Sequence, residues 1–180
     1  PFLPVSLRRS DAPIYVQGSF VSGGYFGVLG IHPALGRALS VADDTPGTPC
    51  AAIISHRLWT REFNQSPSIA GQTITAAGTP CAIVGVAPLR FRGHQGGYDV
   101  DVWLPLRPFH VDMLDNHQLA FFSGVIGRLP SRVSRAYAES QLTTLYQSIV
   151  AAEPASAFRE GRPRPAATEF GIRLLPGAQG

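Results

Sequence analysis

The sequence predicts an α+β fold with mixed sheets and one long amphipathic helix, and two observations support this prediction. Short segments typical of β-strands recur between glycine- and proline-rich turns, whereas only two segments are typical of substantial helices. The strand and helix patterns also lack the regular alternation that a parallel βαβ sheet requires.

The first half of the chain predicts short strands separated by brief helical turns. An extended run breaks at Gly23-Gly24, and a short apolar helix with Tyr25 and Phe26 follows. Gly36-Arg37 ends this motif, which contains nothing that activates a nucleophile or holds a metal. The other expected elements are strands at 5–8, 14–21 and 50–54, a helix at 56–64 capped by Ser55, a helical turn from Ser66-Pro67 to Gly71, and a hairpin of 72–76 and 81–86.

The second half predicts further strands and the long helix. Residues 100–104 alternate as a half-buried strand, and we expect additional strands at 121–129 and 170–175. Ser134 is expected to cap a helix over 135–153, which Pro154 ends. Its predicted apolar stripe consists of Ala138, Leu142, Leu145, Ile149 and Ala152.

Composition and charge exclude several classes of protein. With 44% hydrophobic and 15% charged residues, the 180-residue sequence is typical of a globular protein. No stretch reaches the roughly 18 consecutive apolar residues of a membrane span. The 15 basic residues are all arginine and are scattered, so a net charge of +3 does not indicate nucleic-acid binding. The chain begins at Pro1 without a methionine, which we interpret as a piece of a longer protein.

The two cysteines lie in identical pentapeptides, Gly-Thr-Pro-Cys-Ala, that each precede an apolar run. One interpretation is two strands that start alike, with Cys50 and Cys81 as small buried residues. The other is that both strands start at the same end of one sheet and that the sulfur atoms bond, which requires an oxidising compartment.

The candidate catalytic and metal-ligating residues do not form a convincing site. The Ser55 hydroxyl is expected to accept from backbone donors at the helix start, and the glycine-rich loop 93–97 lacks the strand and helix that flank a phosphate-binding loop. Three acidic or histidine-containing groups remain. We interpret Asp43-Asp44 as a solvated turn, Asp99 and Asp101 as a charge pair in preference to a cation site, and His110, Asp112, Asp115 and His117 as a polar loop in preference to a metal site.

Seven stretches together resemble a known family. They are FVSGGYFGVLGIHPALGR (20–37), VADD (41–44), CAAIISHRLWTREFN (50–64), SPSIAGQTITAAGTPCAIVGVAP (66–88), FRG (91–93), DVWLPL (101–106) and IGRL (126–129), which precedes the long helix. Their order resembles the MacB-like periplasmic core domain of FtsX/MacB-type ABC transporter permeases, particularly the branch of acidobacterial duplicated orphan permeases.

The resemblance implies an extracytoplasmic domain that membrane helices tether to the bacterial inner membrane. A porter-like part would comprise 1–37 and 118–180 and be incomplete at its N-terminus, and a sabre-like part would comprise 38–117. The implied function is non-catalytic: coupling of permease motion to substrate export or to engagement of a partner protein. The implied partners are the other permease domains, a cytoplasmic ATPase subunit and a periplasmic protein, without a cofactor and without nucleic acid.

The resemblance also gives roles to individual residues. Gly23, Gly24, Tyr25, Phe26, Gly36 and Arg37 would set the shape of the domain, and an extracytoplasmic location favours a Cys50–Cys81 disulfide, with free thiols as the alternative. Phe91 and Arg92 would contact a partner if Phe91 is exposed, whereas the alternative buries Phe91 under the hairpin. Two other functions stay open: a ligand-binding sensory module with its pocket mouth at 93–97, and a metal-dependent enzyme using His110 to His117.

Overall fold

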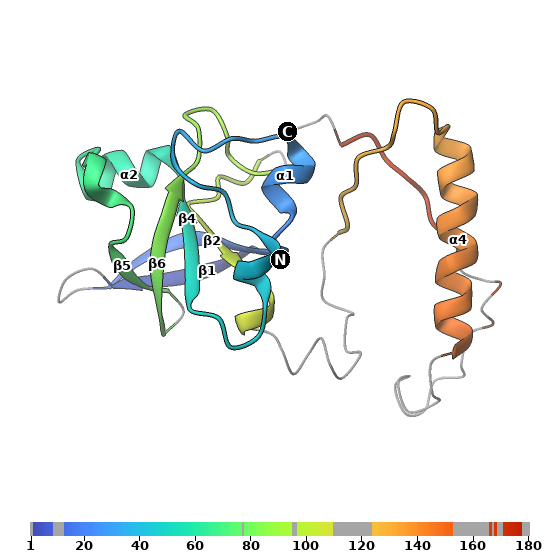
Figure 1. Ribbon diagram of the computed structural model, residues 1–180, viewed down its shortest axis with the longest axis horizontal. Coiled ribbons are helices and arrows are strands. Elements are labelled where there is room, and N and C mark those ends of the chain that lie inside the picture. Colours follow the sequence, from blue (N-terminus) through green and yellow to red (C-terminus); the bar gives the residue numbers. More distant parts are fainter. Residues whose placement is uncertain are drawn as a thin grey trace. The chain divides into compact units, whose positions relative to one another are not determined.

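The computed structural model describes residues 2–8, 13–76, 78–94, 97–109, 124–152, 166, 168 and 171–177. These residues belong to two compact units, and the boundary lies between Ile126 and Gly127 (Figure 1). We describe each unit by itself.

A seven-stranded mixed sheet forms the first unit. Its strand order is β3-β6-β4-β7-β2-β1-β5, and β5 also pairs with β6. Six strands therefore close into a ring, and β3 adds to β6 outside it. The strands are β1 (Phe2–Arg8), β2 (Ile14–Val21), β3 (Leu35–Gly36), β4 (Cys50–Ile54), β5 (Thr73–Ala76), β6 (Thr79–Val86) and β7 (Val102–Pro105).

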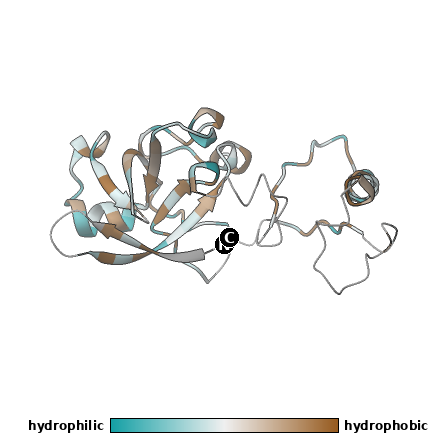
Figure 2. Ribbon diagram, turned by 90° about the horizontal axis from the view of Figure 1, so that it is seen from below, coloured by the Kyte–Doolittle hydropathy of each residue, from teal (hydrophilic) through white to brown (hydrophobic). Residues whose placement is uncertain are grey.

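Strand β4 is buried on both faces, which explains why its sequence is a continuous apolar run. Cys50, Ala52 and Ile54 face one core, which they share with the inward residues of β1, β2, β5 and β6. Ala51 and Ile53 face a second core on the opposite side of the sheet. In Figure 2 many of the brown, apolar residues of this unit lie on its strands.

Two short helices and two 3-10 turns close the ends of these cores. Helix α2 (His56–Phe63) buries Leu58 and Phe63 in the first core, and η2 (Pro67–Ile69) buries Ile69 there. Helix α1 (Tyr25–Leu29) covers the second core, and η1 (Val41–Asp44) follows β3. The predicted elements between residues 5 and 105 are thus confirmed, whereas β3 and η1 were not predicted. The half-burial predicted for the strand at 100–104 is wrong, because all four residues of β7 are buried.

Helix α4 (Arg135–Ala152) is the main element of the second unit. Ser134 caps it as predicted, since its Oγ accepts from the backbone N–H of Tyr137 at 3.2 Å. Residues 171–177 run beside the helix: Ile172 N–H donates to Thr143 Oγ1 at 2.9 Å, and Leu174 N–H donates to Glu139 Oε1 at 2.8 Å.

Two predictions for the C-terminal half are wrong. The described residues 124–129 and 171–175 form no strand, because neither pairs with another strand and the latter bonds to side chains of α4. The predicted apolar stripe on α4 is partly exposed, since Leu145 and Ile149 are about half exposed. An apolar pattern at helical spacing shows which face is apolar, but it does not supply the surface that covers it.

Candidate functional site

Through Asp44, the η1 turn contacts the start of α1, which lies within the motif that runs from Gly23 to Arg37. The backbone N–H of Gly23 donates to Asp44 Oδ2 at 3.1 Å, and the backbone N–H of Arg107 donates to Asp44 Oδ1 at 2.8 Å. One carboxylate therefore holds the start of α1, the η1 turn and the chain after β7. We call this contact and the adjacent ion pair of Arg37 with Asp43 the joint.

The ion pair of the joint is bidentate. Arg37 Nη1 and Nη2 donate to the two oxygens of Asp43 at 2.7 and 2.8 Å, and the backbone N–H and hydroxyl of Ser40 donate to Asp43 Oδ2 at 2.8 and 2.7 Å. These bonds, chiefly that of Arg37, lower the pKa of Asp43 to about 2. The predicted turn is thus confirmed, but its solvation is wrong, since the Asp43 side chain is only 10% exposed.

The spacing from Ser40 to Asp43 is the signal that sequence reasoning missed. A serine three residues before an acidic residue at the start of a helical turn is the pattern of a capping box. It would have indicated that Asp43 accepts hydrogen bonds within the turn.

Gly23 and Gly36 lie where backbone segments approach closely. A Cβ atom on Gly23 would lie 2.6 Å from Ser40 C and 2.8 Å from Val41 N, and still closer to the Ser40 carbonyl oxygen. Gly36 has a φ of +75°, and its added Cβ would overlap the carbonyl oxygen of Val84. Gly24 differs, because an added Cβ there would meet no atom within 4 Å.

An aromatic cluster joins α1 to the loop before β7. Phe26 and Phe91 contact Trp103 with ring centroids 5.7 and 5.3 Å away. The Tyr25 hydroxyl and His94 Nδ1 share a hydrogen bond of 3.0 Å, while burial raises the pKa of Tyr25 to about 12 and lowers that of His94. Phe91 therefore faces inward, against α1 and β7, where the sequence had suggested either exposure or burial under the hairpin.

A second charged network lies at the start of α2. Arg57 donates through Nη2 to Asp101 Oδ1 and through Nη1 to Asp99 Oδ2, both at 2.8 Å. Ser55 Oγ donates to Asp101 Oδ1 at 3.3 Å and accepts from the Leu58 N–H at 3.0 Å, as predicted for a cap. Arg57 therefore forms an ion pair with each of the two aspartates that the sequence suggested as a charge pair.

A cleft opens beside this network. Its volume is about 210 Å³, and it is lined by Ser55, His56, Arg57, Leu89, Phe91, Arg92, Asp99 and Val100. Arg92 is largely exposed at its edge and donates through Nη1 to both oxygens of Asp99 at 3.1 Å. The cleft is thus partly apolar and partly charged.

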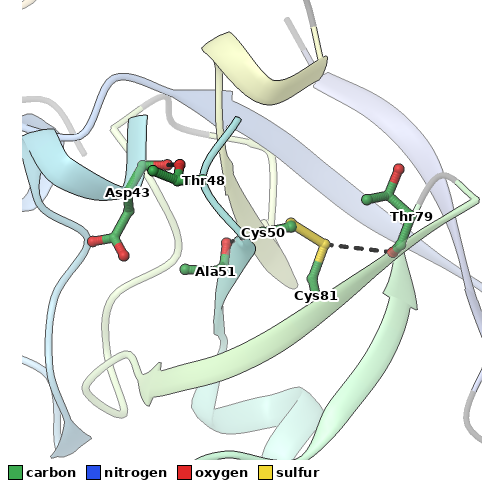
Figure 3. The surroundings of a disulfide bond; sticks show 6 residues. All are labelled: Asp43, Thr48, Cys50, Ala51, Thr79 and Cys81. Carbon is green, nitrogen blue, oxygen red and sulfur yellow. Dashed lines mark hydrogen bonds between the residues drawn. A yellow bond between two sulfur atoms is a disulfide. The ribbon is translucent and has the colours of Figure 1, made fainter. Parts of the chain in front are cut away.

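A disulfide links the two strands that start with the repeated pentapeptide. Strands β4 and β6 are parallel, with Cys50 directly opposite Cys81, a Cα–Cα distance of 4.4 Å and an S–S distance of 2.05 Å (Figure 3). Both sulfur atoms are buried within the first core. The sequence had left this pairing and free thiols as alternatives.

The last candidates from the sequence concern a metal site. His110, Asp112, Asp115 and His117 lie outside the described residues. Within the described ranges, no three His, Cys, Asp or Glu side chains are grouped as metal ligands. Nor does any helix in this part of the chain have the length and apolar character needed to cross a bilayer.

Comparison with known proteins identifies the family. Residues 3–145 match the model of the MacB-like periplasmic core domain. No curated protein sequence matches the chain significantly.

Three solved structures are similar to the chain. The periplasmic region of MacB from Actinobacillus actinomycetemcomitans has a TM-score of 0.56 and 18% identity, with 82% of this chain and 64% of that one covered. A domain of a permease protein from Porphyromonas gingivalis has a TM-score of 0.52 and 16% identity, covering 82% and 65%. The extracellular domain of the noncanonic ABC-type transporter YknZ from Gram-positive bacteria has a TM-score of 0.46 and 20% identity, covering 63% and 54%.

The chain therefore spans between about half and two thirds of the length of these structures. At such identities the two structures with TM-scores above 0.5 support the fold, and the family model supports the ancestry. The chain belongs to the family of MacB-like periplasmic core domains of ABC transporter permeases.

Proposed function

We propose that this domain is a non-catalytic, extracytoplasmic coupling element of an ABC-type permease subunit. Flanking membrane helices would tether it to the inner membrane, and a cytoplasmic ATPase subunit would supply the energy. Movement of the permease would then be passed on to substrate export or to a partner protein. The family match supports this proposal.

The joint is the observation that carries the proposal. A domain on membrane tethers transmits displacement only if it moves as a body, so segments far apart in sequence have to be fixed to one another. Asp44 fixes residues 23 and 107, which are separated by most of the first unit's length. The closed ring of strands and the Cys50–Cys81 disulfide add further constraints on the same unit.

The division into porter-like and sabre-like parts stays a proposal. The structure adds one constraint to it: β1 and β2, from the predicted porter-like part, pair in one sheet with β4, β6 and β7. Residues before and after position 37 therefore belong to the same compact unit. The proposed division between porter-like and sabre-like parts follows the family resemblance alone.

Distance measurements in the full-length permease test the proposal. Spin labels at Tyr15 and Arg61, both exposed in the first unit, would report its internal distance, and labels at Tyr15 in two permease subunits would report relative movement. We expect ATP to change the distance between subunits while the internal distance stays constant. With a hydrolysis-deficient ATPase subunit as the control, the distance between subunits should stay at one value, either that without ATP or that with ATP bound.

The opposite pattern would contradict the proposal. If ATP changed the internal distance and left the distance between subunits unchanged, the unit would deform instead of transmitting movement. The same result would favour the alternative of a sensory module, whose conformation responds to a ligand.

A further inference from the structure

The cleft beside α2 is too small for a ligand of ordinary size. Small-molecule sites typically enclose about 300–1,000 Å³, whereas this cleft measures about 210 Å³ and Leu89 and Arg92 at its edge are more than 70% exposed. Such a space accommodates one or two side chains of another protein. Leu89, Phe91 and Val100 provide its apolar surface.

The charges around the cleft favour an acidic occupant. Arg92 contacts Asp99 through Nη1, and its Nε and Nη2 make no hydrogen bond with other described residues. Arg90, next to two lining residues in the chain, is exposed and pairs with no carboxylate in the described part of the chain. The two aspartates of this surface are already bound by arginine, since Arg57 neutralises the buried Asp101 and shares Asp99 with Arg92.

The free edge of Arg92 has the geometry to bind a carboxylate. Guanidinium N–H groups bind carboxylates through two parallel hydrogen bonds, and at an exposed site such a pair gives moderate affinity and strong orientation. An apolar side chain placed next to that carboxylate would reach Leu89 and Phe91. The two contacts together select an apolar residue flanked by acidic ones.

We propose that this cleft docks an acidic segment of a partner protein, with one apolar side chain in the cleft and a flanking carboxylate on Arg92. The proposal rests on the proposed function, from which it takes the presence of a partner outside the membrane. It adds the chemistry by which that partner is recognised.

Peptide binding to the 180-residue chain tests the proposal. The probe is a synthetic peptide with one leucine between two pairs of glutamates, and the matched control peptide carries glutamine in place of each glutamate. We expect the glutamate peptide to shift the backbone NMR signals of Leu89, Arg92 and Val100 at millimolar concentrations, and added salt to weaken its binding. The glutamine peptide should shift these signals much less.

Two substitutions complete the test. Arg92→Gln should weaken binding of the glutamate peptide about fivefold, the value of one exposed charge pair. Arg107→Gln removes the same charge from an exposed residue that does not line the cleft, and it should leave binding unchanged. Because both side chains are exposed, both variants should fold.

Three results would overturn the docking proposal: no signal shifts, equal binding of the two peptides, or equal effects of the two substitutions. None of them bears on the movement of subunits with ATP, which is measured without a peptide. Failure of this inference is thereby distinguishable from failure of the proposed function.

Discussion

Substitution of Gly23 by alanine should destabilise the first unit strongly, whereas the same change at the adjacent Gly24 should not. The added methyl group at residue 23 would lie 2.6 Å from Ser40 C and 2.8 Å from Val41 N. Since ordinary contacts of this kind measure 3.4 Å or more, the η1 turn has to move by about 1 Å. That movement pulls Asp44 away from the N–H of Gly23.

The expected loss follows from these two effects. Overpacking costs about 1–3 kcal/mol, and weakening a hydrogen bond to a charged group costs about 1–2 kcal/mol more. We expect the free energy of unfolding to fall by about 3 kcal/mol, which lowers the melting temperature by about 10 °C for a unit of this size. Domains of this kind have about 5–15 kcal/mol of stability, so the variant should still fold.

Urea unfolding followed by tryptophan fluorescence measures this loss. Trp103 is fully buried against Phe26 of α1 and therefore reports on the relevant core. Gly24→Ala is the matched control, because its backbone angles of −79° and −4° suit alanine and no atom lies within 4 Å. It should change stability by less than about 0.5 kcal/mol. Equal losses in the two variants, or no loss in either, would refute the steric reasoning.

Three further predictions concern the other contacts of this unit. Asp43→Asn should lower the free energy of unfolding by about 1 kcal/mol at neutral pH, because solvent screens the ion pair with the half-exposed Arg37. Because the pKa of Asp43 falls from 3.8 to about 2 on folding, the difference between wild type and variant should be complete above about pH 5 and disappear as the pH falls towards 2; urea midpoints across this range would show it, and a constant difference would contradict it. Reduction of the Cys50–Cys81 disulfide, which closes a sequence separation of 31, should cost about 3–4 kcal/mol, and two alkylatable thiols in the unreduced native protein would exclude the bond. Ser55→Ala should cost about 1–2 kcal/mol through loss of the helix cap, whereas Thr60→Ala on the exposed face of α2 should cost under about 0.5 kcal/mol in the same unfolding assay; equal costs would argue against the cap.

Local chemistry made much of the first unit predictable. The all-apolar run of β4 indicated a buried strand, and Ser55 indicated the start of α2. In each case the physical cause lies within a few residues of the signal. The helix cap, for example, requires only a hydroxyl three residues before the N–H that it accepts from.

Contacts between distant segments could not be predicted in this way. Asp101 lies 44 residues from Arg57 and 84 from Gln17, and it contacts both. Which arginine neutralises a buried aspartate depends on strand order, and the spacing of charges along one strand contains no such information. The described parts of two predicted strands, 124–129 and 171–175, form no strand for the same reason, because β-propensity forms a strand only where an edge is available.

Gly23 and Gly24 are adjacent and identical in sequence, but they have different roles in the structure. Gly23 is required by a backbone contact, whereas Gly24 is not. Asp44 likewise binds two backbone N–H groups, of residues 23 and 107, and no side chain of either. Side chains at position 107 can therefore change without loss of this bond, provided that the residue retains its N–H. Because Asp44 binds only the backbone N–H of residue 107, this contact of the joint fixes the chain after β7 while the side chain at position 107 is free to vary.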